Sequence, residues 1–405
     1  MIPRERYMQK IRPFMNTPVV KVFTGIRRCG KSVMLELVQA ELRETGVTAD
    51  QIIALNFESA LDPRVRSMES MLNAIYEHKN RDSTGRLYLF FDEIQELPGW
   101  EKLINSLMVD TDADIYITGS NARLLSGELA TYLAGRYVEI RIYPFSFAEA
   151  YTVLSNGESP ITQEDAFKQY LLRGGFPFLY KYPFSDADAN QYISDIFDST
   201  ILKDIAQRNN VRDIAQLRQQ VLYFIANTGN TFSATSLVKY LKNQRRTIST
   251  ETIYNYIEYY RSACLLHLVQ RRDLAGKAIL TTQEKIYLVD HGIREALYGN
   301  NQKDINQVLE NIVYMELLRR DFEVTVGKSK NAEVDFCATK GAATLYVQVC
   351  YLLAADETVE REFAVLESIP DNYPKYVLSM DEIDRSRNGI IHKNIRNFLL
   401  GDFVR

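Results

Sequence analysis

The chain has few cysteines for its length, only four among 405 residues. Cys29, Cys264, Cys337 and Cys350 lie far apart and form no Cys-x-x-Cys pair. This spacing argues against a dense disulfide framework and indicates a reducing, cytoplasmic compartment.

Long apolar segments and a strong charge excess are also lacking. No run approaches the roughly 20 apolar residues of a membrane-spanning helix, and the first residues have no apolar signal-peptide core. The net charge is only −4, so the whole chain carries no global signature of nucleic-acid binding. We therefore expect a soluble, cytoplasmic protein with no membrane partner.

What the chain contains instead is an ordinary globular composition, with 46% hydrophobic and 25% charged residues. Such a composition can bury hydrophobic cores and gives no sign of disorder. The length predicts two to four domains of roughly 100 to 150 residues.

A phosphate-binding motif lies near the start of the chain. Residues 19–24, "VVKVFT", predict a buried strand, "GIRRCGKS" follows at residues 25–32, and a helical pattern comes next. This is the strand, GxxxxGK[ST] and helix order of a P-loop, in which backbone N–H groups surround phosphate oxygens. Lys31 is expected to reach the β- and γ-phosphates and Ser32 to bind Mg²⁺. The residues expected to line the nucleotide are Gly25, Ile26, Arg27, Arg28, Cys29, Gly30, Lys31, Ser32 and Val33.

The two arginines of this loop have no assigned role. Arg27 and Arg28 could meet phosphate, contact a neighbouring subunit or project into solvent.

Two carboxylates follow a second apolar strand. "RLYLFFDEI", residues 86–94, places Asp92 and Glu93 at the carboxyl end of a predicted parallel strand, where open α/β sheets form their sites. We expect Asp92 to hold Mg²⁺ through water, and Glu93 to orient and deprotonate the attacking water.

A third strand, within residues 114–122, ends in Ser120 and Asn121. Their hydroxyl or amide could reach the γ-phosphate or the attacking water, although a simple polar turn or helix cap is an alternative. Two further apolar runs, around Asn56 and Glu139, complete five strands that alternate with helices. This alternation predicts an α/β domain with a parallel sheet.

Together, "GIRRCGKS", "LYLFFDEI" and "ITGSNA" resemble Walker A, Walker B and sensor 1 of the AAA+ class of P-loop ATPases. "GRYVEIRIYPFSFAEA", "RGGFPFLY" and "ILKDIAQRNNVRD" resemble phrases of a large prokaryotic family of AAA+ ATPases with a C-terminal domain of unknown function. The resemblance covers essentially the whole chain, and it implies ATP and Mg²⁺ as cofactors and a sheet order of 5-1-4-3-2.

The resemblance suggests two further nucleotide contacts. Arg136 could act as an arginine finger, in its own subunit or across an interface, or it could be a structural arginine. "RGGFP", residues 173–177, resembles a lid motif in which Pro177 packs on adenine, although a helix-terminating break is the alternative.

The middle of the chain is helical and locally basic. Residues 201–272 hold eleven Lys and Arg against four Asp and Glu. Three predicted helices followed by two strands have the layout of a winged helix, whose third helix would span residues 249–266. Lys242, Arg245 and Arg246 precede that helix and could contact DNA phosphates. Because the helix itself is tyrosine-rich, a structural or regulatory role is the alternative; we interpret His291 as structural.

The last hundred residues resemble the PD-(D/E)xK nuclease fold in element order. Glu310 matches its helix acid and Asp335 its strand acid, but Gln348 and Cys350 stand where a second acid and a lysine belong. This departure predicts a nuclease-like domain without activity, because a thiol cannot supply a fixed positive charge.

We therefore expect four parts: an AAA+ core at residues 1–145, a helical lid at 146–208, a winged-helix domain at 209–300 and a nuclease-like α/β domain at 301–405. The predicted function is Mg²⁺-dependent ATP hydrolysis that couples nucleotide state to binding of DNA or a protein partner, and a homo-oligomer is a further expected possibility. The catalytic residues would be Lys31, Glu93, Asn121 and Arg136, with Ser32 and Asp92 as metal ligands. A nucleotide switch without hydrolysis and an ATP-coupled DNA nuclease are the alternatives.

Overall fold

The computed structural model describes residues 2–79, 85–121, 133, 135–157, 161–243, 248–274, 279–299, 302–328 and 333–401. They form two compact units. The first consists of Met1–Tyr143 with Ser262–Cys264, and the second of Pro144–Arg261 with Leu265–Arg405. Each helix in these ranges is too short or too polar to cross a lipid bilayer.

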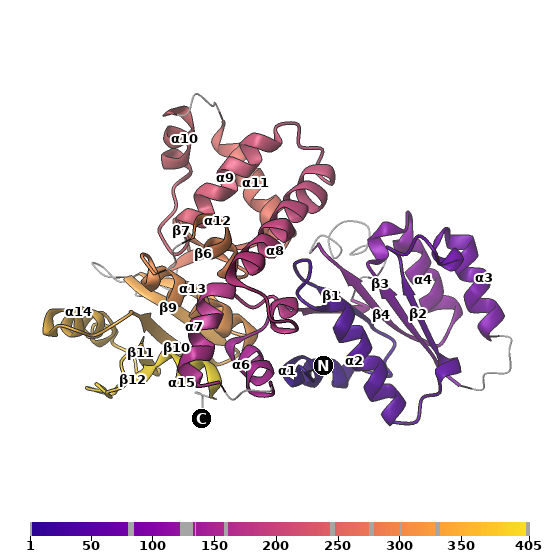
Figure 1. Cartoon of the computed structure of the whole chain (residues 1–405), viewed down its shortest axis with the longest axis horizontal. Helices are drawn as coiled ribbons and strands as arrows, with labels where there is room; N and C mark the ends of the chain where they lie inside the picture. The colour runs from indigo at the N-terminus through magenta and orange to yellow at the C-terminus, as the bar shows by residue number, and fades with distance from the viewer. Residues whose placement is uncertain are drawn as a thin grey trace. The chain divides into compact units, whose positions relative to one another are not determined.

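The first unit contains a parallel five-stranded sheet (Figure 1). Its strands are β1 (Val20–Thr24), β2 (Ile52–Asn56), β3 (Leu87–Asp92), β4 (Ala113–Gly119) and β5 (Tyr137–Arg141). They lie in the order β2-β3-β4-β1-β5, which confirms the order expected from the resemblance.

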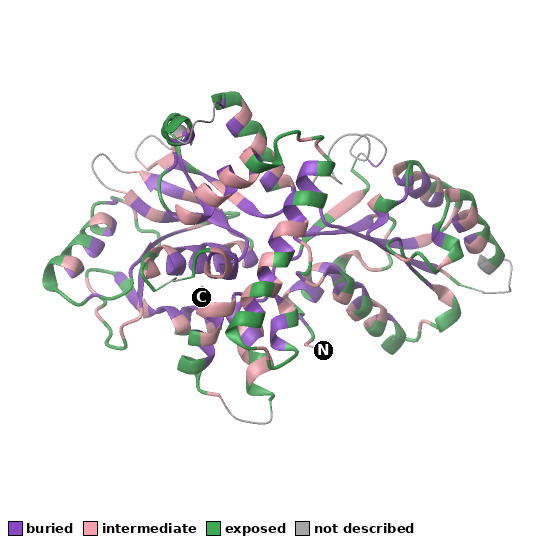
Figure 2. Cartoon of the chain, turned by 45° about the horizontal axis from the view of Figure 1, so that its top comes forward, coloured by how far each residue is buried: buried purple, intermediate pink, exposed green. Residues whose placement is uncertain are grey.

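Burial along these strands follows their position in the sheet. Every residue of β1 and β3 is buried, and β4 is buried after its first residue, whereas the edge strands β2 and β5 are partly exposed. A parallel sheet covered on both faces requires continuous apolar strands at its centre. Figure 2 shows these inner strands in the colour of buried residues.

Helices connect the strands of this unit. They are α2 (Lys31–Glu44), α3 (Met68–Lys79) and α4 (Trp100–Asp110), while α1 (Glu5–Ile11) precedes the first strand. On α4 the buried residues are Trp100, Leu103, Ile104 and Leu107, spaced three or four apart, so a single face of the helix enters the core.

The second unit begins with the helices of the predicted lid. These are α6 (Phe147–Ser155), α7 (Gln163–Arg173), η6 (Pro177–Tyr180) and α8 (Asp186–Ser199), which continues into a π-helix at Thr200–Gln207. The π-helix was not predicted from the sequence. Within this unit α7 and α8 contact α12 (Gly292–Tyr298), and α6 contacts α15 (Ile395–Leu400).

The three predicted middle helices and the hairpin are present. The helices are α9 (Ile214–Ala226), α10 (Ala234–Asn243) and α11 (Thr250–Ser262), and the hairpin pairs β6 (Leu266–Asp273) with β7 (Ile279–Leu288). Their interpretation as a DNA-binding winged helix stays a prediction. Lys242 is exposed, whereas Arg245 and Arg246 lie outside the described residues.

The C-terminal elements follow the predicted order of helix, three strands, helix and strand. They are α13 (Ile305–Arg319), β8 (Glu323–Lys328), β9 (Glu333–Lys340), β10 (Ala343–Val349), α14 (Asp356–Glu367) and β11 (Lys375–Ser379), followed by β12 (Ile390–Asn394). Strand β6 pairs with β8, so the hairpin belongs to one seven-stranded sheet in the order β12-β11-β10-β9-β8-β6-β7. The boundary expected near residue 300 therefore does not separate two sheets.

Candidate nucleotide-binding site

The loop between β1 and α2 has the backbone of a phosphate-binding loop. Gly25 has a φ of 151°, and a Cβ there would lie 2.2 Å from the carbonyl oxygen of Ile142. Gly30 has a φ of 102° immediately before α2 begins at Lys31. Glycine is needed at both positions, because side chains rarely adopt these angles and the first site has no room for one.

Side chains on this loop divide into anchors and exposed groups. Ile26 and Cys29 are fully buried, whereas Arg28 and Ser32 are exposed and Val33 is half-buried. Arg27 lies 3.6 Å from Glu58 in an ion pair. The structure therefore turns Arg28 toward solvent and gives Arg27 a carboxylate partner in its own chain.

Lys31 connects the loop to the second carboxylate. Its Nζ donates to the carbonyl oxygens of Gly25 and Ile26, at 3.1 and 3.4 Å, and lies 3.4 Å from Glu93 Oε1. Burial by itself would lower the pKa of Lys31, but Glu93 raises it above its ordinary value. The buried side chain is therefore an ammonium ion that a phosphate can attract.

Asp92 ends β3 and is held by two neighbouring strands. Thr118 Oγ1 donates to Asp92 Oδ1 at 2.6 Å, and Asn56 Nδ2 donates to Oδ2 at 3.2 Å. Hydrogen bonds of this kind orient a carboxylate that binds metal. Sequence reasoning missed Thr118 and Asn56 as site residues, although both lie at or near the carboxyl ends of their strands.

Glu93 follows in a left-handed backbone conformation with a φ of 53°. Its N–H donates to Thr118 Oγ1 at 2.8 Å, and Gln95 donates to its carboxylate. Burial by itself would raise the pKa of Glu93, but Lys31 lowers it below its ordinary value. The side chain is therefore a charged carboxylate at neutral pH, as a general base must be.

Ser120 and Asn121 follow β4 and are both buried. Since β4 lies between β1 and β3, its carboxyl end lies between the phosphate loop and the two carboxylates. The sheet thus brings Lys31, Asp92, Glu93 and Asn121 to one edge, in the arrangement expected from the sequence.

Arg136 lies elsewhere. It precedes β5, its backbone oxygen accepts from Val20 N at 2.9 Å, and its side chain donates to Asn105 Oδ1 at 2.9 Å. Val20 begins β1, so Arg136 lies at the amino edge of the sheet, opposite the loop that follows Thr24. The expectation that Arg136 contacts the phosphates of its own subunit is therefore wrong, because parallel strands all start at the far edge.

Arg141, the last residue of β5, lies at the edge of the sheet that carries the phosphate loop. Arg141 pairs in register with Thr24, the residue before the phosphate loop, and lies 3.3 Å from Glu139. Glu139 also accepts from Thr24 Oγ1 at 2.5 Å. Sequence reasoning missed Arg141, although the parallel register of "YVEIR" could have identified it. Pro177 belongs to the second unit, and its contact with adenine stays a prediction.

The donors at this edge fit Mg²⁺. The described residues hold no group of three or more His, Cys, Asp or Glu side chains that could bind a metal ion by themselves. Mg²⁺ usually takes one or two protein oxygens, with waters and substrate phosphates completing its octahedron. Ser32, exposed at the start of α2, and the oriented Asp92 supply such oxygens.

In the second unit, the two nuclease-like acids lie beside an unexpected lysine. Lys285 Nζ on β7 lies 2.8 Å from Glu310 Oε1, 3.1 Å from Glu333 Oε1 and 3.7 Å from Asp335 Oδ1. Burial and the neighbouring Glu310 raise the pKa of Asp335 well above its ordinary value. The nearby Lys285 acts against this rise, so its ammonium group compensates negative charge in the cluster.

We predict that Lys285→Met destabilises the fold by about 3–5 kcal/mol at neutral pH, because buried carboxylates lose their cation. The loss should shrink as pH falls, since the Asp335 carboxyl, whose pKa is raised, becomes neutral in the folded state before it does in the unfolded state. Urea unfolding at several pH values measures this. Lys340→Met, at an exposed lysine of the same sheet, is the matched control; an equal, pH-independent effect of the two changes would contradict the prediction.

The glutamine and cysteine of β10 have structural partners. Gln348 Nε2 donates to Glu362 Oε2 at 2.8 Å, while its Oε1 accepts from Asp335 N at 3.2 Å. Cys350, just after β10, is buried in an apolar cluster, and burial raises the pKa of its thiol. The position expected for a lysine is thus part of a hydrophobic core.

Gln348→Glu is predicted to destabilise the chain by about 1–3 kcal/mol at pH 7, because two carboxylates would then face each other. Stability should recover as pH falls and one of them is protonated. Thermal unfolding at pH 7 and pH 5 is the measurement. Gln348→Met, which removes both hydrogen bonds without adding charge, should show no such recovery, and an identical pH profile of the two variants would refute the explanation.

His291 is structural, as interpreted from the sequence. Burial lowers its pKa to about 4, so the ring is neutral, and its Nε2 lies 2.6 Å from the carbonyl oxygen of Tyr170. With an acceptor at that distance, the ring proton resides on Nε2.

Comparison with known proteins adds family relationships. The family described as "AAA domain" matches residues 17–151, and the family described as "Domain of unknown function (DUF8612)" matches residues 164–304. The chain is 38% identical over 380 residues to an uncharacterized protein of Haemophilus influenzae, covering 94% of this chain and 93% of that protein.

It is also 30% identical over 362 residues to the uncharacterized protein MJ1544 of Methanocaldococcus jannaschii, covering 86% of this chain and 78% of that protein. Among solved structures, the ORC1 protein of Aeropyrum pernix in complex with DNA shares 12% identity and a TM-score of 0.31, covering 75% of this chain and 94% of that chain. A similarity this low carries no argument about function.

Proposed function

We propose that the first unit binds ATP with Mg²⁺ and hydrolyses it. The chain belongs to one family with these Haemophilus influenzae and Methanocaldococcus jannaschii proteins, and it carries an AAA domain of the AAA+ ATPase superfamily. The observation that carries the proposal is the meeting of Lys31 and Glu93, 3.4 Å apart, at the sheet edge where the phosphate loop ends.

Binding would use the backbone of the loop and the ammonium of Lys31. The loop N–H groups and the amino end of α2 attract anions, because both present unpaired donors. Lys31 now donates to carbonyl oxygens of its own loop and would exchange them for phosphate oxygens. Ser32 and Asp92 would hold Mg²⁺, which supplies charge neutralisation of the phosphates.

Hydrolysis would use Glu93 as the base. When Lys31 turns to phosphate, the Glu93 carboxylate keeps its hydrogen bond from Gln95 and can accept a proton from water. Asn121, buried after β4, is proposed to orient that water or the γ-phosphate. Arg136 is proposed to act only across a subunit interface, and a homo-oligomer would be required for it.

The ion pair between Lys31 and Glu93 supports a second candidate. Because Glu93 is engaged by Lys31, a switch that holds ATP without turnover is also compatible with this geometry. A DNA nuclease is less well supported, since Gln348 hydrogen-bonds to Glu362 and Cys350 packs in a hydrophobic cluster, at the positions where the nuclease fold has an acid and a lysine.

Steady-state phosphate release with Mg²⁺, with excess chelator, and with single- or double-stranded DNA tests these proposals. The ATPase predicts release that the chelator abolishes, and a DNA partner predicts stimulation by DNA through the basic segment at residues 201–272. ATP binding without release would favour the switch. Metal-dependent DNA cutting that Asp335→Asn removes would favour the nuclease.

A further inference from the structure

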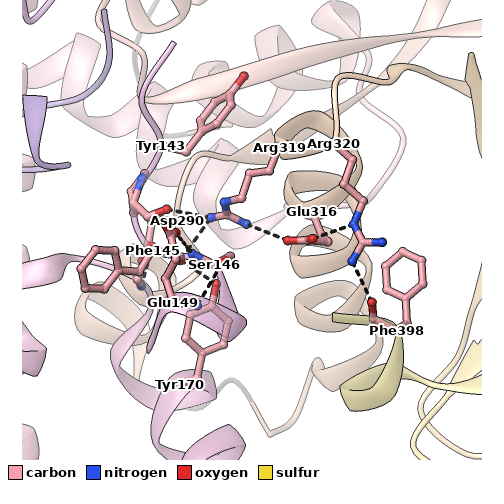
Figure 3. Close-up of polar contacts among 12 residues, drawn as sticks. Tyr143, Phe145, Ser146, Glu149, Tyr170, Asp290, Glu316, Arg319, Arg320 and Phe398 are labelled. Carbon is pink, nitrogen blue, oxygen red and sulfur yellow. Dashed lines mark hydrogen bonds and ion pairs between the residues drawn. The ribbon is translucent and has the colours of Figure 1, made fainter. Parts of the chain in front are cut away.

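The chain first passes from the first unit to the second at the peptide bond between Tyr143 and Pro144, and it is fixed on both sides of this boundary. On the second side, Arg319 of α13 donates to the carbonyl oxygens of Pro144 and Phe145, at 3.1 and 3.3 Å (Figure 3). Phe145 N also donates to Gly175 O at 2.6 Å. The segment entering the second unit therefore moves with that unit.

Arg319 is itself held in a network. Glu316 lies between Arg319 and Arg320, at 4.0 and 2.7 Å, and Arg320 donates to Phe398 O at 2.8 Å (Figure 3). Both Glu316 and Arg319 are buried. A buried charged network of this kind keeps its geometry, so Arg319 is a rigid attachment point.

In the first unit, Arg4 connects the boundary to the phosphate loop. Arg4 Nη1 donates to Cys29 O at 3.0 Å, inside the loop, and Arg4 Nη2 donates to Tyr143 O at 2.8 Å. The guanidinium lies 4.5 Å from the centre of the Tyr7 ring, and Tyr7 Oη accepts from Tyr143 N at 3.1 Å. Arg4 is buried.

Two further features indicate that the Arg4 hydrogen bonds to Cys29 and Tyr143 are a specific structural link. Arg4 has a φ of 44°, a left-handed conformation that costs a non-glycine residue about 1–2 kcal/mol and persists where surrounding contacts require it. Ile142 N also donates to Thr24 O at 2.7 Å, directly before the loop. Ile142 and Tyr143, which lead to the boundary, are therefore held both to the residue before the loop and, through Arg4, to Cys29 within it.

We propose that Arg4 is a positioning residue that transmits nucleotide occupancy from the phosphate loop to the boundary between the units. This inference rests on the proposed ATP binding. When the peptide between Cys29 and Gly30 reorients to direct the Gly30 N–H at phosphate, the carbonyl oxygen of Cys29 must move. The guanidinium is planar, with its donors at fixed spacing, so it carries that displacement to Tyr143 O. The orientation of the second unit then depends on nucleotide.

The test is energy transfer between dyes on Glu44→Cys in the first unit and Glu357→Cys in the second, both exposed positions. The four native cysteines are buried and leave the introduced thiols as the reactive ones. A non-hydrolysable ATP analogue with Mg²⁺ is titrated, and its affinity is measured in parallel by calorimetry. In the wild type we expect a nucleotide-dependent change in transfer efficiency.

Arg4→Lys keeps the charge but cannot bridge two carbonyl oxygens with a planar fork. It should bind the analogue within about tenfold of the wild type and lose at least half of the change in transfer. Arg6→Lys, on the helix that Arg4 precedes, is the matched control and should keep the change. Tyr7→Phe, which removes the acceptor of Tyr143 N, should reduce it and serves if Arg4→Lys does not fold.

An unchanged response of both the Arg4 and Tyr7 variants would overturn the inference. So would loss of binding in Arg4→Lys, because Arg4 would then support the loop rather than link it to the boundary. Binding to the wild type without any change in transfer also overturns it and leaves the proposed function intact, whereas absence of binding to the wild type refutes the proposed function itself.

Discussion

Glu93→Gln should reduce the rate of ATP hydrolysis by about 10²–10⁴-fold, because the amide cannot accept the proton of the attacking water. ATP affinity should stay close to that of the wild type, since the loop, Lys31 and Asp92 remain. The Gln95 side chain can still donate to the remaining oxygen at position 93. Single-turnover phosphate release and calorimetry on the same preparation measure the two quantities separately.

The control for this change is Glu44→Gln, at an exposed carboxylate near the end of α2. It removes the same charge from the same unit and should leave both rate and affinity unaltered. Glu93→Gln with undiminished hydrolysis would mean that another group acts as base. A variant that binds no ATP would mean that Glu93 is needed to position Lys31.

Lys31→Met should abolish measurable ATP binding, because it removes the buried ammonium group that contacts both the loop carbonyl oxygens and Glu93. It should also lower the free energy of unfolding by about 3–5 kcal/mol, since Glu93 is left buried without its partner. The double variant Lys31→Met with Glu93→Gln should recover much of that stability, although not ATP binding. Urea unfolding of the four forms gives the coupling energy.

The pH dependence of this pair has a definite sign. The pKa of Glu93 is lowered, so its contribution to stability is present above its unfolded value and disappears as pH falls through the folded value. The pKa of Lys31 is raised, so its contribution is complete below its unfolded value and is lost as pH rises through the folded value. The difference in unfolding free energy between wild type and Lys31→Met should therefore be largest between about pH 5 and 10, and should decrease on either side of this range. A difference that stays constant across the whole pH range would contradict the assigned ion pair.

Local sequence patterns predicted the first unit well because its polar site residues directly follow the apolar strands along the chain. The apolar runs of β1, β3 and β4 are continuous, and the polar residues come directly after each run. In a parallel sheet all those residues must meet at one edge, so Lys31, Asp92, Glu93 and Asn121 were found together. The same rule places Arg136, which precedes its strand, at the opposite edge of the sheet in its own chain, and it places Arg141, which ends that strand, at the edge of the phosphate loop.

Contacts between distant segments were not predictable in this way. Thr118 was missed because its hydrogen bonds run to a neighbouring strand, and no motif marks them. Lys285 lies on the hairpin, and only the joining of β6 to β8 within one sheet brings it to Glu310. The sequence alone matches Gln348 to a degenerate catalytic position, whereas its hydrogen bond to Glu362 on α14 gives an amide at this position a structural role.

The measurement that tests the central claim most directly is calorimetric titration of Mg²⁺ and ATP into the wild-type chain. The account predicts saturable binding of one nucleotide per chain, weakened when Mg²⁺ is removed and absent in Lys31→Met. Heat of dilution alone in the wild type, with the chain shown to be folded, would contradict the assignment of residues 25–33 as a nucleotide site.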